Sequence, residues 1–497
     1  MRLSESQRPV LVRRSRRLAG LALVLSLAAA LGGCFVGTEK PDAALDVPNA
    51  YRAAPRNADA ALPSVDWWRG FHSAQLTRLV EEALTSNLDI AAAVARIVQA
   101  DAQSRVAGAP LLPVVDFQGS ASRSRSSQST GSGDGGGFGS SERTTYSASL
   151  GASYEIDFWG KNRAALRAAE QTAVASRYDR EVIALSTVAA VANSYFLVLA
   201  SQERLQRARD NLEAATRVYR LIEERFNVGT ASALDTAQQE SLVASVRAAL
   251  PLLEQTLREN TATLALLIGR APAHVRIAGG NLSQIGIPPV TPGLPSDLLA
   301  QRPDIREAEA LLAAANANVE SARAAMFPSI QLTGEGGYQS AILRTLLRPE
   351  SALFNLTAGL AQPVFDGFRL QGLLDLQRGR QDELLQLYRK AVISAFSDVE
   401  RALIATQQSA ERERLQLQVV VSSRRAFEIS ETRLREGAVD LVTVLNTQQS
   451  LFLAQDAQVQ ARLARLQAVV SLFQALGGGW PLPRDERPQA VAGTRPP

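Results

Sequence analysis

The sequence is poor in the side chains that most catalytic and metal sites require. Among 497 residues there is one cysteine, Cys34, and there are two histidines, His72 and His274, which lie far apart in the chain. A single cysteine excludes an intramolecular disulfide, and two isolated histidines make a poor metal site. No Ser/His/Asp arrangement or metal-ligand spacing occurs either. The sequence therefore predicts no catalytic residue, no metal site and no cofactor, and the protein is not expected to be an enzyme.

The sequence also lacks an excess of charge and, beyond its N-terminus, any long hydrophobic run. The formal net charge of +4 falls to −1 once residues 1–33, with six arginines and one glutamate, are set aside. The rest of the chain then has no excess of positive charge to attract nucleic acid, so no nucleic-acid partner is expected. After this segment, no uninterrupted run of 18 apolar residues indicates a transmembrane helix. If the protein crosses a membrane, it must do so as a β-barrel.

Proline and glycine are missing from one long stretch, and this absence predicts the largest helix. Neither residue occurs from Lys161 to Val228, so a helix there would extend about 100 Å at ~1.5 Å per residue. Gly229 suits the left-handed cap of such a helix, and the chain then returns as a second helix over 232–267. Apolar residues near the end of the first helix are spaced alternately by three and four, as in a coiled coil. They are Leu205, Ala208, Leu212, Ala215, Tyr219, Ile222 and Phe226.

The N-terminus has the pattern of a secretory signal. An arginine-rich segment precedes an apolar run over 18–31, which predicts a signal peptide over residues 1–33. The run ends in Leu31-Gly32-Gly33-Cys34, which resembles a bacterial lipobox. The resemblance implies cleavage before Cys34 and attachment of lipid to its sulfur and amino group. The alternative is a lone buried cysteine at the end of an apolar run.

The residues after Cys34 bear on the destination of the protein. Phe35 stands where an aspartate usually retains such lipoproteins in the inner membrane, so the resemblance implies the outer membrane. Several lipid chains anchor a protein firmly, whereas one anchors it marginally. Residues 34–72 are expected to form a lipid anchor and an irregular strap, whose Trp67, Trp68 and Phe71 pack against the body of the protein.

Residues 113–158 change the hydrophobic period from 3.6 to 2 and predict a β-hairpin. Val115, Phe117 and Ala121 alternate with polar residues, and seven apolar residues from Tyr146 to Phe158 do so again. Each strand is about long enough to cross a bilayer when it is tilted, with one face apolar and the other in water. The glycine-rich loop between the strands lacks the lysine of a phosphate-binding loop and is expected to face solvent.

The second half of the chain repeats the first. Asp89-Ile90 matches Asp304-Ile305, and Gly160 matches Gly367, at similar offsets. Each repeat is predicted to contain a helix, a β-hairpin and a long helical hairpin. The expected divisions are a first repeat over 73–270 with hairpins 113–158 and 161–268, a linker over 271–295, a second repeat over 296–480 with hairpins 328–366 and 367–476, and a disordered tail over 481–497.

Four strands per chain are too few to close a barrel, and an open sheet edge is not tolerated in lipid. Three chains would supply twelve strands, which is within the usual range. The sequence therefore predicts an α+β membrane protein. Its homotrimeric 12-stranded β-barrel would be continuous with a long barrel of antiparallel α-helical coiled coils, and outer-membrane lipid would surround the strands.

The sequence as a whole resembles the TolC-like outer-membrane efflux family, in particular its lipoprotein branch, which is NodT/OprM-like. The resemblance extends over nearly all of the chain after the signal. It implies an exit duct that passively conducts drugs or other small toxic compounds. It also implies two partners, a periplasmic membrane fusion (adaptor) protein and an inner-membrane RND pump. The motifs that carry it are Arg302-Pro303-Asp304-Ile305-Arg306-Glu307-Ala308-Glu309, Met326-Phe327-Pro328-Ser329-Ile330, Ile156-Asp157-Phe158-Trp159-Gly160, Gln362-Pro363-Val364-Phe365-Asp366-Gly367 and Arg225-Phe226-Asn227-Val228-Gly229.

The family resemblance also points to the two helix–helix turns, at Gly229 and Gly437, as the periplasmic tip. In the family an aspartate six residues after the first turn glycine helps to narrow the entrance, and Asp235 holds that position. The second turn departs from the family pattern, because Thr443 and Asn446 replace two aspartates and Asp440 lies three residues after the glycine. The other interpretation of Asp235 is a solvated carboxylate at a helix start.

Other features leave alternatives open. Arg225 and Arg433 lie close to the tip turns, where they could pair with acids of the tip or of the adaptor. The same fold could serve as the outer-membrane duct of a type I protein secretion system. A lipid-tethered coiled-coil stalk without a pore is a third hypothesis, and the alternating strands argue against it.

Overall fold

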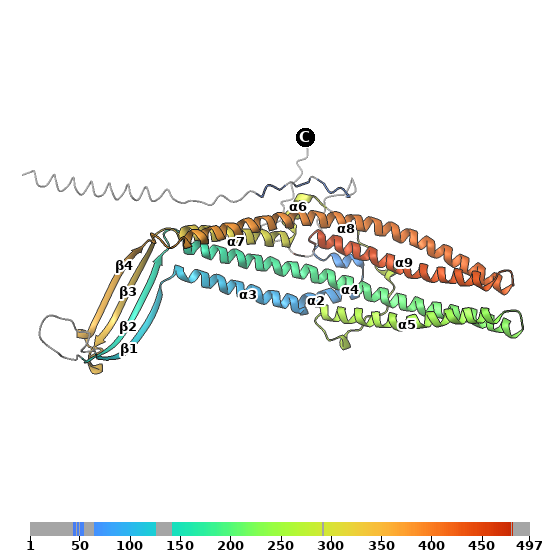
Figure 1. Ribbon diagram of the computed structural model, residues 1–497, viewed down its shortest axis with the longest axis horizontal. Coiled ribbons are helices and arrows are strands. Elements are labelled where there is room, and N and C mark those ends of the chain that lie inside the picture. The colour runs from blue at the N-terminus through green and yellow to red at the C-terminus, as the bar shows by residue number, and fades with distance from the viewer. Residues whose placement is uncertain are drawn as a thin grey trace, which may run out of the picture.

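The computed structural model describes residues 43–45, 47–48, 50–53, 64–125, 142–290, 293–478 and 480. The expected signal peptide, Cys34, the glycine-rich loop and the tail lie outside the described residues. The described chain is elongated, with a sheet at one end, a bundle of helices in the middle and two helical hairpins that reach the other end (Figure 1).

Two copies of the same element order make up the described chain. The long helices of the two copies have equal lengths, 67 residues for α4 and α8 and 35 residues for α5 and α9. The first copy is α2 (Ala74–Ser86), α3 (Leu88–Gly108), β1 (Val114–Arg125), β2 (Glu142–Ile156), α4 (Lys161–Asn227) and α5 (Ala233–Leu267). The second is α6 (Pro295–Gln301), α7 (Pro303–Ala324), β3 (Ser329–Ser340), β4 (Ala352–Ala361), α8 (Arg369–Arg435) and α9 (Leu441–Ala475). Short 3-10 turns are η2 (Trp67–Phe71), η3 (Ala109–Leu111), η5 (Pro272–His274), η6 (Leu282–Gln284), η7 (Leu343–Thr345) and η8 (Pro349–Ser351).

The sequence predicts that the first repeat begins with one helix, but the structure has two, α2 and α3, because the chain breaks at Asn87. Asn87 has an extended backbone, and its side-chain oxygen caps α3 by accepting from the N–H groups of Asp89 and Ile90. Its amide donates to the carbonyl of Leu267 at the end of α5, 2.8 Å away. One side chain thus satisfies the ends of two helices, which makes the break stable.

The coiled-coil seam of α4 also differs from the expected one near its end. Ala215 and Ile222 are buried as expected, together with Val218, which the spacing rule omitted. Phe226 is 44% exposed because the helix ends one residue later and the chain turns away. Phe158 likewise lies beyond the end of β2, in the turn that precedes α4.

The four strands form one antiparallel sheet in the order β1-β2-β3-β4. The expected pairing of β1 with β2 and of β3 with β4 is confirmed, and β2 pairs with β3 to join the two hairpins. The register places Asp116, Gly151, Glu335 and Asn355 in one row across the sheet. Because side chains alternate along each strand, this row and the rows two residues away share one face.

The main core lies in the middle of the molecule, where η2 packs on α4 and α9. Trp67 stacks on Phe473 with 4.9 Å between ring centroids, and Phe71 contacts Phe196. The expected packing of the strap aromatics is therefore confirmed. One 18-residue window of α4 is apolar enough to span a membrane, but 67% of it is buried inside the protein. That window belongs to the core.

Arg302, the first residue of the motif over 302–309, joins α7 to two other helices. Its guanidinium donates to Asp304 at 2.6 Å, to Asp398 on α8 at 3.4 Å and to the carbonyl of Ala475 on α9 at 3.1 Å. Burial opposes the charge of Arg302, but the hydrogen bonds and charges of the two aspartates outweigh it and raise the pKa of Arg302. The motif is thus a joint between helices.

Glu307 lies one helical turn after this joint, on the partly buried side of α7. Burial raises the pKa of its carboxyl from 4.5 to about 7, and the negative charges of Asp179 and Asp304 add to the rise. Below pH 4.5 the carboxyl is protonated in the folded and unfolded states alike. As the pH rises from about 4.5 to about 7, the unfolded state gives up this proton while the folded state keeps it, so the folded state loses stability relative to the unfolded state.

Replacing Glu307 by Gln should therefore change how stability depends on pH. We expect Glu307→Gln to match the native protein at pH 4.5 and to exceed it by roughly 1–3 kcal/mol at pH 8, because no charge then has to be buried. Thermal unfolding at both pH values measures this. Glu309→Gln, at an exposed site on the same helix, is the control. A difference that does not vary with pH would contradict the assignment.

Candidate functional site

The two helix–helix turns lie side by side at the end of the molecule opposite the sheet (Figure 1). Both turn glycines are left-handed, with φ of 80° at Gly229 and 72° at Gly437. The N–H of the next residue returns to the preceding turn of helix in each case, from Thr230 to Arg225 and from Ala438 to Arg433, at 2.8 Å. The two tips therefore use the same cap, in which a side chain at the glycine would be strained.

The helices after the two turns each begin with a hydroxyl and a carboxylate three residues apart, and the order of these two groups is reversed between the helices. In α5, the hydroxyl of Ser232 caps the helix and accepts from the N–H of Asp235, whose carboxylate accepts from the N–H of Ser232 at 2.8 Å. In α9, Asp440 is the cap, and its carboxylate accepts from the N–H and the hydroxyl of Thr443. The capping group at the start of each helix thus contains one carboxylate, which also stabilises that helix.

The side chain of Asp440 is exposed and that of Asp235 is partly exposed, and neither carboxylate is joined to the other turn. The hydrogen bonds from Thr443 stabilise the charged form of Asp440 and lower the pKa of its carboxyl. Asn446 is exposed one turn further along α9. In the described part of the chain, every hydrogen bond from the side chains of Asp235, Asp440 and Thr443 stays within its own turn.

The tips are instead connected by Arg225, and its counterpart Arg433 plays no such part. Nη1 of Arg225, at the end of α4, donates to the carbonyl of Leu434 on α8 at 2.6 Å. Arg433 is exposed and makes no side-chain hydrogen bond or ion pair with the described residues. The repeat is therefore asymmetric at the tip, and sequence reasoning treated the two arginines alike.

A small apolar core lies beneath this connection and contains two buried glutamines that sequence reasoning missed. Nε2 of Gln239 donates to the carbonyl of Ala215, whereas neither amide atom of Gln448 has a partner among the described residues. Both glutamines are fully buried. Their polar character at a seam position was the available signal. The apolar members of this core are Val218, Ile222, Phe427, Leu434, Leu441, Val444 and Leu451.

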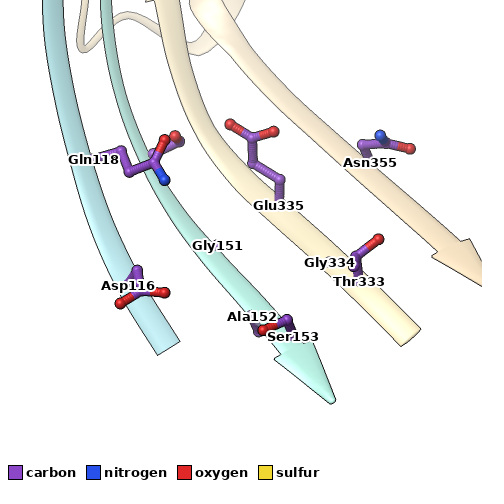
Figure 2. A pocket seen from close by; sticks show the side chains of 10 residues that line it. Asp116, Gln118, Gly151, Ala152, Ser153, Thr333, Gly334, Glu335 and Asn355 are labelled. Atoms are coloured by element: carbon purple, nitrogen blue, oxygen red, sulfur yellow. The ribbon is translucent and has the colours of Figure 1, made fainter. Parts of the chain in front are cut away.

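The sheet at the other end separates its side chains by polarity. One face carries a groove of about 420 Å³ lined mainly by apolar residues such as Tyr154, Leu332 and Leu356. The opposite face carries a cavity of about 270 Å³ (Figure 2). Its polar lining includes Asp116, Gln118, Ser149, Thr333, Glu335 and Asn355. The sequence predicted a polar face for this sheet but did not single out a cavity on it.

Within the described ranges, no group of three His, Cys, Asp or Glu side chains lies close enough together to hold a metal ion. The geometry at the tip and on the sheet consists of exposed carboxylates, a connecting guanidinium and a polar wall. Such groups can attract, repel or admit solutes, and they supply no nucleophile–base pair.

Comparison with known proteins agrees with this arrangement. The family model described as "Outer membrane efflux protein" matches residues 79–270 and 294–478. The pyoverdine export outer membrane protein OpmQ of Pseudomonas aeruginosa is 42% identical over 458 residues, which cover 92% of this chain and 96% of that relative. The cation efflux system protein CusC of Escherichia coli is 30% identical and covers 92% of this chain and 98% of its own length.

Solved structures show the same fold. The outer-membrane channel OprN matches with a TM-score of 0.83 and 26% identity, over 90% of this chain and all of that one. A crystal structure of CusC matches with a TM-score of 0.76 and 28% identity, over 87% of this chain and 100% of its own. The expected fold class, with its two internal repeats, is thereby confirmed. The chain belongs to the outer membrane efflux protein family and is an outer-membrane channel rather than an enzyme.

Proposed function

We propose that this protein is the outer-membrane exit duct of a tripartite RND-type efflux system. Three copies would form a gated channel that passively conducts drugs or other small toxic compounds from the periplasm to the exterior. The observation that carries this proposal is a sheet with two unpaired edges, one apolar face and one polar face.

The sheet edges require a closed assembly in lipid. In the described chain, neither β1 nor β4 has a second strand partner. Unpaired backbone groups are not tolerated in a bilayer, and twelve strands from three copies would close a barrel of ordinary size. Phe117 on β1 and Leu356 on β4 are 71% and 80% exposed on the apolar face. That face would contact lipid, and the polar face would line the lumen.

The junction between β4 and α8 also favours several copies. Val364 is 97% exposed in the single chain, and Phe365 and Phe368 nearby are 79% and 76% exposed. Solvent exposure of large adjacent apolar side chains is unfavourable, and such patches mark interaction sites. In a trimer this junction would pack against the next copy, on the side of its α3 and β1.

The tip is the part of the duct that would meet the periplasmic adaptor protein and, beyond it, the pump. It lies at the end of α4 and α8, which are each about 100 Å long at ~1.5 Å per residue and so reach far from the sheet. Val228 and Leu234 are 75% and 65% exposed there and offer apolar contacts. Asp235 and Asp440 of three copies would surround the entrance, where carboxylate rings favour cations.

The relatives support small compounds as cargo. Their names refer to export of pyoverdine, to antibiotic efflux and to cation efflux. The alternative from the same fold is the duct of a type I protein secretion system. Deleting the gene tests both functions: sensitisation to small toxic compounds supports the efflux duct, whereas loss of a secreted polypeptide without sensitisation contradicts it.

We further propose that residues 1–33 are removed as a signal peptide and that Cys34 then carries the lipid anchor, with residues 34–72 as the strap. Cys34 lies outside the described residues, so this proposal rests on the lipobox resemblance and on the outer-membrane family. The repeat boundaries at 73–270 and 296–480, with 271–295 as a linker, belong to the same proposal.

Cys34→Ser should abolish lipid labelling. The serine oxygen cannot replace the thiolate that receives the lipid, while the strands of the barrel are unaffected. Metabolic labelling with radioactive palmitate followed by gel analysis measures the modification, and trimer formation is the control. Labelling that persists in Cys34→Ser would remove the lipoprotein assignment.

Asp235→Ala should enlarge the resting conductance of the purified trimer in planar bilayers. The substitution removes a carboxylate from the entrance and half of a capping box. In the proposed closed state this carboxylate narrows the entrance, so its loss should widen the entrance. Asp235→Asn, which keeps a capping oxygen without the charge, separates the two effects. An unchanged current in Asp235→Ala would contradict the gate, and a purified trimer without any conductance would favour the stalk.

Arg225→Met should also raise the resting conductance, because the tips lose the hydrogen bond to the carbonyl of Leu434 while the apolar stem is kept. A hydrogen bond from a charged donor contributes about 1.5–3 kcal/mol. Arg433→Met is the matched control, since Arg433 occupies the equivalent position without this contact. Equal conductance changes in the two variants would show that Arg225 does not hold the tips together.

A further inference from the structure

The cavity on the polar face of the sheet holds two carboxylates in one row. Asp116 on β1 and Glu335 on β3 both pair in register with Gly151 on β2, which lies between them. Two strand spacings of ~4.8 Å separate the two positions by about 10 Å. Gly151 has no side chain, and a Cβ built there would meet nothing within 4 Å. The row is therefore open between the two carboxylates (Figure 2).

Neither carboxylate has a partner in the described chain. The side chains of Asp116 and Glu335 make no hydrogen bond and no ion pair with the described residues. By contrast, Glu155, further along the same face, is paired with Lys161 at 2.5 Å. The two charges in the cavity thus remain available to a solute.

A third polar side chain in the same cavity also lacks a partner. Ser149 is only 7% exposed, yet it lines the cavity. Gly337 on β3 packs directly on it, because a Cβ built on Gly337 would come within 2.7 Å of the Cβ of Ser149. Its hydroxyl forms no hydrogen bond with the described residues. A nearly buried polar group without a partner indicates a position that a ligand or water completes.

On this face of the described strands, no basic side chain lies close enough to neutralise the two carboxylates. Side chains alternate, so the residues that share the face of Gly151 on β2 have odd numbers, and Arg143 is the one base among them. Arg143 is eight residues along the strand, or about 27 Å at ~3.4 Å per residue. This exceeds the screening length of ~8 Å at physiological ionic strength, so the carboxylates set the local potential.

We propose that Asp116, Glu335 and Ser149 form a subsite for a cationic group, such as the ammonium of an amine-bearing solute, on the wall of the barrel. Ammonium groups carry N–H donors, which each carboxylate and the serine oxygen can accept, while Gln118 and Asn355 offer further polar contacts. This inference rests on the proposed trimer, in which three such cavities face the lumen.

The subsite would weakly attract cationic solutes as they pass through the channel. A conducting pore needs sites that bind a solute strongly enough for it to enter and weakly enough for it to leave. Rings of Asp and Glu side chains select cations. The cavity is open to solvent, which keeps binding weak. Cationic solutes would therefore be concentrated at the wall, and anions of the same size would be disfavoured.

The experiment uses spermidine as the probe on the purified trimer. Spermidine added on the barrel side should transiently block the current in planar bilayers at 0.1 M KCl. In the variant Asp116→Asn/Glu335→Gln we expect a half-blocking concentration about fivefold higher or more, and a potassium-to-chloride permeability ratio closer to one. At 1 M KCl the difference should vanish, because the screening length falls to ~3 Å.

Control variants separate charge from shape. Asp116→Glu/Glu335→Asp keeps both charges and should retain the block, and Asp375→Asn, which removes an exposed carboxylate on α8, should leave the block unchanged. Spermidine binding measured by calorimetry on the same trimers checks the subsite without conduction. A trimer that does not conduct but binds spermidine less well in the double variant would contradict the duct and support the subsite. Equal block or equal binding in the native and double-variant proteins would overturn the subsite.

Discussion

Two strand edges without partners determine how the rest of this protein has to be organised. A single chain builds a sheet of four strands whose faces differ in polarity, and among the described residues the outer edges of β1 and β4 have no partner strand. In water such a sheet would expose its apolar face, and in lipid it would expose backbone N–H and C=O groups that have no alternative partner. Closure by further copies satisfies both demands at once, and the helical hairpins that continue from each β-hairpin must then line up as a tube.

The duplicated architecture shows where the two halves can differ without harm to the fold. Both tips have a glycine in the left-handed conformation and a hydroxyl–carboxylate pair at the next helix start. The pair is exchanged between Ser232/Asp235 and Asp440/Thr443, because either order satisfies the exposed N–H groups of a helix. The position of the negative charge relative to the tip changes with the exchange. The caps thus preserve helix geometry while the charge pattern of the entrance varies.

Much of the fold followed from local rules. Absence of proline and glycine predicted α4 to within one residue, alternation predicted the strands and their pairing, and the spacing of turn glycines predicted the repeat. Local rules failed where a side chain makes a distant contact. Asn87 ends a helix because its amide reaches Leu267, which no periodicity reveals. Val218 is buried in the seam, whereas Phe226 is exposed because α4 ends one residue later and the chain turns away.

The sequence by itself determined the element types, their order, the two faces of the sheet and the absence of the usual catalytic residue combinations, since these depend on composition and on spacing of two or 3.6 residues. Only the tertiary structure decided which of two equivalent arginines connects the tips and which polar residues meet in one cavity. Arg225 and Arg433 occupy matching positions, and only packing brings the first within 2.6 Å of a carbonyl on another helix. Asp116 and Glu335 are far apart in the chain, and strand register alone places them beside the same glycine.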